Sequence, residues 1–155
     1  MTLAAGDKAP DFALPADDGG TLGLGDLAGR KAVLYFYPKD DTPGCTTEAR
    51  DFTELAQAFA EADTAIVGVS KDTVEKHRRF VDKHVLGIRL LSDAEGGLCE
   101  AFGVWQEKKL YGRIFMGIVR ATFLIGRDGR IARAWPKVRV KGHAAEVLEA
   151  ARLLD

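Results

Sequence analysis

The sequence places one cysteine where a helix is expected to begin. Cys45 ends the segment Thr42-Pro43-Gly44-Cys45, which follows a strongly apolar run. Threonine is a favoured N-cap residue and proline is the favoured first helical residue, so Cys45 is expected at the third helical position. Free backbone N–H groups and the positive end of the helix dipole favour a thiolate over a thiol there. This placement indicates a nucleophilic cysteine. A small buried cysteine that only packs is the alternative, because the helical period also places it on an apolar face.

The other residues that could do chemistry give weaker patterns. Cys99 stands in the apolar stretch Leu98-Cys99-Glu100-Ala101-Phe102, which is typical of a packing residue. His77 and His84 are two turns apart on one expected helix, about 10 Å, which is too far to share a metal ion. His143 is the only histidine elsewhere, and no orienting partner for it is identifiable, so a cysteine hydrolase is disfavoured. There is no C-x-x-C, no Walker A sequence and no dinucleotide fingerprint. We therefore expect no metal and no cofactor.

Length and composition limit the class of protein. The 155 residues, 46% apolar and 29% charged, predict a single globular domain over residues 1–155. No uncharged apolar stretch approaches the roughly 18 residues of a membrane span, and residues 1–12 lack the pattern of a signal peptide. Two cysteines do not make a secreted disulfide framework. We therefore expect a cytoplasmic protein without a membrane partner.

Charge is unevenly distributed along the chain. The net charge is −1, yet residues 105–141 contain ten basic residues and two acids, Glu107 and Asp128. This segment is either a solvated basic face or a surface that attracts an anionic small molecule or an acidic protein. No nucleic-acid partner is expected, because no aromatic-basic pattern of a known module is present.

The elements that must position these residues alternate between strand and helix. The turn sequence Asp18-Gly19-Gly20 is expected between two weak strands, and Asp128-Gly129 predicts a hairpin. Long crossovers predict parallel pairing of the first central strands, and the hairpin adds an antiparallel pair. The pattern indicates an α/β fold with a central mixed sheet flanked by helices. Strands are expected over 31–38, 64–70, 88–91, 121–125 and 131–135, and helices over 43–61, 73–86, 94–102 and 144–154.

Several motifs resemble one family. The pattern Pro38-x-x-x-Thr42-x-x-Cys45 resembles the peroxidatic-cysteine motif of the peroxiredoxins, and TPGCTTEA is similar to the Q subfamily, the bacterioferritin comigratory protein type. The segments KAPDFALP, LYFYPKDDTPGCT, SDAEGGLCEAFGVW and GIVRATFLIGRDGRI resemble Q-type counterparts in order and spacing, so the likeness covers most of the chain. It implies a thioredoxin-like fold and a thiol-dependent peroxidase, active in antioxidant defence. The implied substrates are hydrogen peroxide and alkyl hydroperoxides.

The resemblance also implies a role for each matched residue. Cys45 would attack the peroxide and become a sulfenic acid. Thr42 would orient the peroxide and the thiolate with its hydroxyl, and Pro38 would shield the site from water. Arg120 would stabilise the thiolate and the polarised peroxide. Glu48 either anchors that arginine or is simply a favourable acid in the first helical turn.

The second half of the cycle departs from many Q-type proteins. They carry a second cysteine five residues after the nucleophile, where this chain has Arg50. Either Cys99 reaches Cys45 as a resolving cysteine after local unfolding, or an external thiol reduces the sulfenic acid. We favour the external thiol, which would be thioredoxin, glutaredoxin or a small thiol, and we expect a monomer or a weak dimer. A redox-sensing or chaperone-like module that keeps the fold without turnover is the alternative function, and peroxide consumption separates the two.

Overall fold

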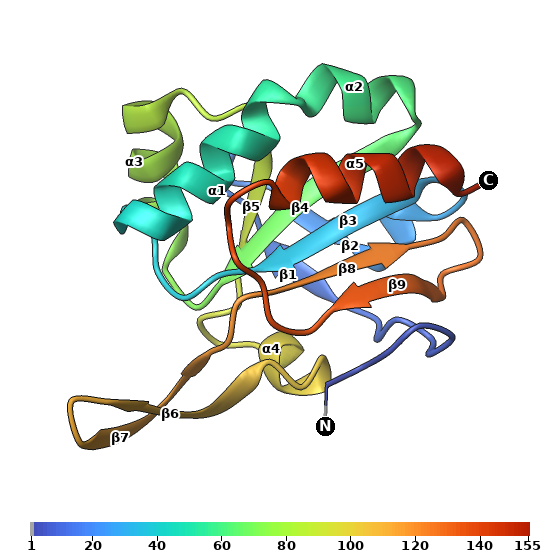
Figure 1. The fold of residues 1–155 in the computed structure, drawn as a ribbon. Helices are drawn as coiled ribbons and strands as arrows, with labels where there is room; N and C mark the ends of the chain where they lie inside the picture. Colours follow the sequence, from blue (N-terminus) through green and yellow to red (C-terminus); the bar gives the residue numbers. More distant parts are fainter. Residues whose placement is uncertain (1) are drawn as a thin grey trace.

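The computed structural model describes residues 2–155, and a five-stranded sheet forms its centre (Figure 1). The strand order is β5-β4-β3-β8-β9. β3 pairs in parallel with β4, and β4 with β5, whereas β8 and β9 run antiparallel to their neighbours. The expected mixed sheet is therefore confirmed, including its parallel and antiparallel halves. The strands are β3 (Lys31–Phe36), β4 (Thr64–Ser70), β5 (Arg89–Ser92), β8 (Ala121–Ile125) and β9 (Ile131–Trp135).

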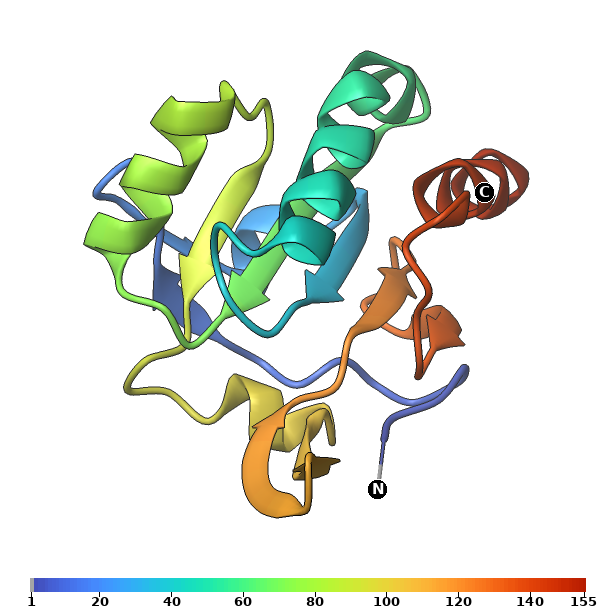
Figure 2. The same ribbon diagram turned by 60° about the vertical axis from the view of Figure 1, so that its left-hand side comes forward.

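Helices cover both faces of the sheet, most of them on one side (Figures 1 and 2). Successive side chains of a strand point to opposite faces. Val33 and Tyr35 of β3 accordingly join one apolar core, with residues of the four longer helices, while Leu34 and Phe36 join the other. On the first face lie α1 (Pro43–Glu54), α2 (Ala56–Glu61), α3 (Val74–His84) and α5 (His143–Leu153). On the second lie α4 (Leu98–Ala101), the 3₁₀ helix Leu24–Leu27 and the hairpin of β1 (Ala13–Pro15) with β2 (Thr21–Gly23).

The single helix expected over 43–61 is wrong in one respect, because the chain breaks it at Leu55 into α1 and α2. The hydroxyl of Thr53 donates to the carbonyl of Ala49 and accepts from the amide of Gly87. A threonine hydroxyl that bonds to the preceding turn tends to bend a helix. The break leaves the first turn of α1, which carries Cys45, unchanged.

One hairpin, formed by β6 (Trp105–Leu110) and β7 (Arg113–Ile118), was not expected from the sequence. The two strands form an antiparallel ribbon that projects from the body (Figure 1). Its two-residue turn, Tyr111-Gly112, has positive φ at both positions, 52° and 76°. Such turns usually contain Asn-Gly or Asp-Gly, so Tyr-Gly is a weak signal. The ribbon also exposes apolar side chains, so it lacks the alternation of a half-buried strand.

No helix among residues 2–155 has the length and apolar character needed to cross a membrane.

Candidate active site

Cys45 lies in the first turn of α1, beyond the carboxyl end of the central strand β3. Thr42 has the extended backbone of an N-cap residue (φ −91°, ψ 156°), and Pro43 is the first helical residue. The predicted third position of Cys45 is therefore confirmed. The cysteine side chain is free and only 2% exposed. The sulfur is therefore largely shielded from solvent.

The side chain of Thr42 does not cap the helix. Its hydroxyl donates instead to the carbonyl of Lys39, at 2.9 Å, within the loop that joins β3 to α1. Thr42 and Pro38 are both half-buried, and they stand at the two ends of that loop. The hydroxyl oxygen of Thr42 keeps lone pairs that can accept a hydrogen bond from a bound molecule.

Arg120 brings a positive charge to the cysteine from a distant part of the chain. It precedes Ala121, the first residue of β8, which pairs with Phe36 at the end of β3. This register places the arginine at the edge of the sheet where α1 begins. Its Nη2 atom donates to the sulfur of Cys45 at 3.3 Å, and its Nη1 atom donates to Oε1 of Glu48 at 2.7 Å.

Gly44 makes room for this arrangement. A Cβ atom at position 44 would lie 3.3 Å from Nη2 of Arg120, closer than ordinary van der Waals contact. The absence of a side chain between Pro43 and Cys45 therefore lets the guanidinium approach the first turn of the helix. Sequence reasoning did not assign this residue a role.

The charges at the site are partly removed from water. Burial raises the pKa of Glu48 to about 7, although Arg120 works in the opposite direction. The second carboxylate oxygen of Glu48, Oε2, is buried and has no hydrogen-bond partner within residues 2–155. Burial also disfavours the charge of Arg120, but the nearby Glu48 and Cys45 outweigh it, and the pKa of Arg120 is raised. The guanidinium therefore stays charged while Glu48 titrates near neutral pH.

Cys99 lies on the other side of the sheet from Cys45. The two thiols belong to different apolar cores, one on each face. Cys99 is fully buried, and its amide donates to the carboxylate of Asp93 at 2.8 Å. Burial, followed by Asp93, raises the pKa of the Cys99 thiol well above its usual range. These surroundings are those of a packing residue.

The histidines occupy three different settings. His143 is buried, its Nε2 lies 2.8 Å from the hydroxyl of Thr122, and burial lowers its pKa to about 4. His84 contacts the exposed Asp41 at 2.8 Å. His77 is fully buried and bonded to Asp40, in the loop before Cys45. Sequence reasoning considered His77 only as a candidate metal ligand, and rejected it because His84 is too far away. The spacing of three residues that separates His77 from both Val74 and Phe80 is the sequence signal that could have revealed its burial.

Comparison with known proteins places this chain in a family. The model of the AhpC/TSA family matches residues 5–134. Peroxiredoxin Bcp of Bacillus subtilis is 54% identical over 96% of this chain and 95% of its own length. Peroxiredoxin Bcp of Escherichia coli is 41% identical, with 94% of each chain covered. The chain belongs to the AhpC/TSA family and is a peroxiredoxin of the Bcp, or Q, type, a class of thiol-dependent peroxidases and thus of oxidoreductases.

Solved structures agree with this placement. Xanthomonas campestris peroxiredoxin Q is 43% identical and superposes with a TM-score of 0.90, covering 96% of both chains. A structure of the X. campestris bacterioferritin comigratory protein, described for its alkyl peroxide reduction activity, has the same identity and TM-score and covers 96% of this chain and 97% of its own. The thioredoxin-like fold implied by the sequence motifs is therefore confirmed.

Proposed function

We propose that Cys45 reduces hydrogen peroxide and alkyl hydroperoxides, with Arg120, Thr42 and Pro38 as the other members of the active site. The observation that carries this proposal is the contact of Arg120 with both the Cys45 sulfur and Glu48. A fixed positive charge beside the sulfur favours the thiolate, which is the nucleophilic form. Glu48 holds Nη1 of the guanidinium, which leaves Nη2 directed at the sulfur. We therefore assign Glu48 a supporting role.

In the first step the Cys45 thiolate attacks the terminal peroxide oxygen. A sulfur–oxygen bond forms, the oxygen–oxygen bond breaks, and the leaving oxygen departs as hydroxide or alkoxide and takes a proton from water. The cysteine becomes a sulfenic acid. The Arg120 guanidinium is positioned to stabilise the negative charge on the leaving oxygen, and the hydroxyl of Thr42 accepts from the peroxide. Pro38 limits the entry of water.

In the second step an external thiol attacks the sulfur of the sulfenic acid. A mixed disulfide forms and water leaves, and a second thiol then releases the Cys45 thiol and carries away the disulfide. Arg50 is exposed and contains no sulfur, and Cys99 packs on the opposite face of the sheet. Both observations support a one-cysteine cycle. Thioredoxin, glutaredoxin or a small thiol would act as reductant in a reducing cytoplasm.

The test is peroxide consumption by the purified protein with dithiothreitol as the reductant. We expect wild type to consume hydrogen peroxide and cumene hydroperoxide catalytically, and we expect Cys45→Ser to be inactive. Cys99→Ser is the matched control, because it makes the same substitution at the other buried cysteine, in the core on the opposite face of the sheet. Stoichiometric oxidation of Cys45 without turnover would instead favour the redox-sensing function. Equal turnover by Cys45→Ser would contradict the assignment of the nucleophile.

A further inference from the structure

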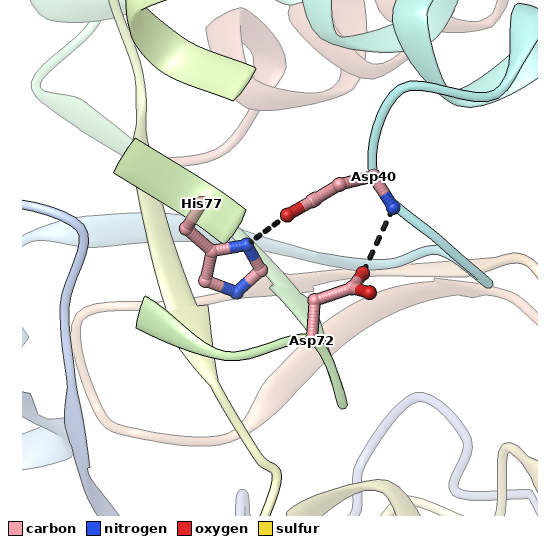
Figure 3. Close-up of side chains that lie close together, drawn as sticks. All are labelled: Asp40, Asp72 and His77. Carbon is pink, nitrogen blue, oxygen red and sulfur yellow. Dashed lines mark hydrogen bonds and ion pairs between the residues drawn. The ribbon is translucent and has the colours of Figure 1, made fainter. Parts of the chain in front are cut away.

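A buried acid–histidine pair ties the loop of residues 38–42 to α3 (Figure 3). Asp40 lies in this loop, and its carboxylate accepts a hydrogen bond from the hydroxyl of Tyr37 at 2.5 Å. Its other oxygen lies 2.6 Å from Nδ1 of His77, a residue of α3 that is 0% exposed. Neither residue contacts Cys45. Asp40, however, lies in the loop that leads to Cys45, and His77 is hydrogen-bonded to that loop.

The hydrogen bonds of His77 fix the nature of this pair. Nε2 lies 2.9 Å from the carbonyl oxygen of Leu91, which can only accept, so Nε2 carries a proton. Nδ1 faces the Asp40 carboxylate, which holds a proton on that nitrogen as well. Burial disfavours the charged ring, but the hydrogen bond that Nδ1 donates to Asp40, the negative charge of Asp40 and the bond to the Leu91 carbonyl together outweigh it, and the pKa of His77 is raised. His77 and Asp40 thus form a buried charge-assisted hydrogen bond.

The same geometry argues against a metal ion at this cluster. Ligand atoms of Asp40, Asp72 and His77 lie within 4.8 Å of one another. Both ring nitrogens of His77 are engaged, however, and Oδ2 of Asp72 accepts from the amide of Asp40 and from the hydroxyl of Ser70. The ligand atoms are already satisfied by protein hydrogen bonds. The cluster is therefore a closed network that fixes a backbone segment.

Several bonds hold this loop against α3 and its preceding turn. The amide of Asp40 donates to Asp72 at 2.8 Å. Asp41 has a positive φ of 60° and contacts Lys83 and His84 of α3, but these contacts are exposed. Exposed ion pairs contribute little, whereas breaking one partner of a buried pair leaves an uncompensated charge. The Asp40–His77 pair is consequently the strongest side-chain tie between the loop and α3.

We infer that His77, acting through Asp40, is a positioning residue for the peroxidatic loop, so that α3 sets where Pro38 and Thr42 stand relative to Cys45. This inference rests on the proposed function. The attack on peroxide requires the sulfur, the Thr42 hydroxyl and the arginine in one geometry, and a misplacement of about 1 Å can lower a rate by about 100-fold. Loss of the tie therefore slows oxidation of Cys45 without removing any group that touches the peroxide.

The experiment compares two substitutions of His77, each of which keeps one of its two hydrogen-bond donors. The amide nitrogen of asparagine falls near the position of Nδ1 and keeps a donor toward Asp40. The amide nitrogen of glutamine falls near Nε2 and keeps the donor toward Leu91. We expect His77→Asn to oxidise Cys45 within about threefold of the wild-type rate constant and His77→Gln to be at least tenfold slower. The readout is the +16 Da species in quenched-flow mass spectrometry with hydrogen peroxide.

Controls separate positioning from general destabilisation. Val147→Ala removes buried volume from α5, which takes no part in the Asp40–His77 hydrogen bond. At a loss of stability in urea that matches that of His77→Gln, this variant should keep the wild-type rate of Cys45 oxidation. Asp40→Asn removes the carboxylate charge from the loop side and should match His77→Gln, and the double variant should be no slower than either. Should His77→Gln fail to fold, Asp40→Asn carries the same comparison against His77→Asn.

The inference is overturned if His77→Gln is no slower than His77→Asn, or if Val147→Ala slows oxidation as much as His77→Gln at equal stability. Additive effects of Asp40→Asn and His77→Gln would also overturn it. Failure of the proposed function has a different signature, because wild type itself would then show no +16 Da species at Cys45.

Discussion

The guanidinium of Arg120 lies 3.3 Å from the sulfur of Cys45, although 75 positions separate the two residues in the chain. The contact exists because β8 pairs with β3, which brings the start of one strand to the end of the other. An arginine held in this way supplies a charge at the sulfur before a peroxide arrives. Preorganised charge of this kind costs no rearrangement at the moment of reaction.

Removing this charge should slow the peroxide step. We expect Arg120→Ala to lower the second-order rate constant for Cys45 oxidation by about 100-fold to 1000-fold, the usual loss for one stabilising donor. Arg120→Lys should recover only part of the rate, because one ammonium group cannot contact both Cys45 and Glu48 as the planar fork does. Stopped-flow kinetics with hydrogen peroxide measures both variants. Wild-type kinetics in Arg120→Ala would contradict the assigned role.

The small size of Gly44 should matter to the same contact. In Gly44→Ala the new Cβ would stand 3.3 Å from Nη2 of Arg120, so the guanidinium has to shift by a few tenths of an ångström. We expect about a tenfold slower oxidation of Cys45, together with a small gain in stability, because alanine is the better helix former. Gly97→Ala is the matched control, since nothing lies within 4 Å of its Cβ position. An equal rate change in both variants would argue against the steric explanation.

The buried carboxyl of Glu48 should make stability depend on pH. Its pKa is raised by burial from 4.5 to about 7, so the folded protein binds this proton more tightly than the unfolded chain. The stability from the protonated group is complete below about pH 4.5 and is lost as the pH rises through about 7. Between pH 5 and 8 this group should lower the free energy of unfolding by about 2 to 3 kcal/mol.

The check is urea unfolding of wild type and Glu48→Gln across that range. The glutamine variant has no carboxyl to ionise, so its stability should fall less than that of wild type from pH 5 to pH 8. Other titrating groups are common to both proteins and cancel in the comparison. Parallel curves would mean that Glu48 is ionised throughout.

The sulfenic acid at Cys45 should persist when no thiol is added. The sheet separates Cys45 from Cys99, and a disulfide requires Cα atoms within about 7 Å. After one equivalent of peroxide we expect a +16 Da species that dimedone traps and that a small thiol converts to a mixed disulfide. Excess peroxide should then over-oxidise Cys45 to the sulfinic acid. A quantitative loss of two hydrogens with a Cys45–Cys99 cross-link would overturn the one-cysteine cycle and would require local unfolding in every turnover.

Local sequence determined much of the framework and the nucleophile. The apolar run at 31–38 and the β-branched run at 64–70 predicted buried strands because a parallel sheet buries both faces. Thr42 and Pro43 predicted the start of α1, and with it the third helical position of Cys45, because residue preferences at the N-cap and first helical position are local. The Thr42 side chain itself makes no capping hydrogen bond, so its extended backbone and the following proline mark the helix start. The Asp128-Gly129 turn predicted the last hairpin for the same reason, since Gly129 adopts a φ of 81°.

Other features were decided only when distant segments packed together. The distance from Arg120 to Cys45 depends on strand register, which no local pattern specifies. The raised pKa of Glu48 depends on burial by neighbours from other elements, and the pairing of Asp40 with His77 depends on where α3 lies against the loop. The separation of the two cysteines follows from the alternation of side chains across β3, which places each thiol on its own face. Sequence alone supplied the reactive groups, whereas the pairing of strands and helices set their distances, their charges and their isolation from one another.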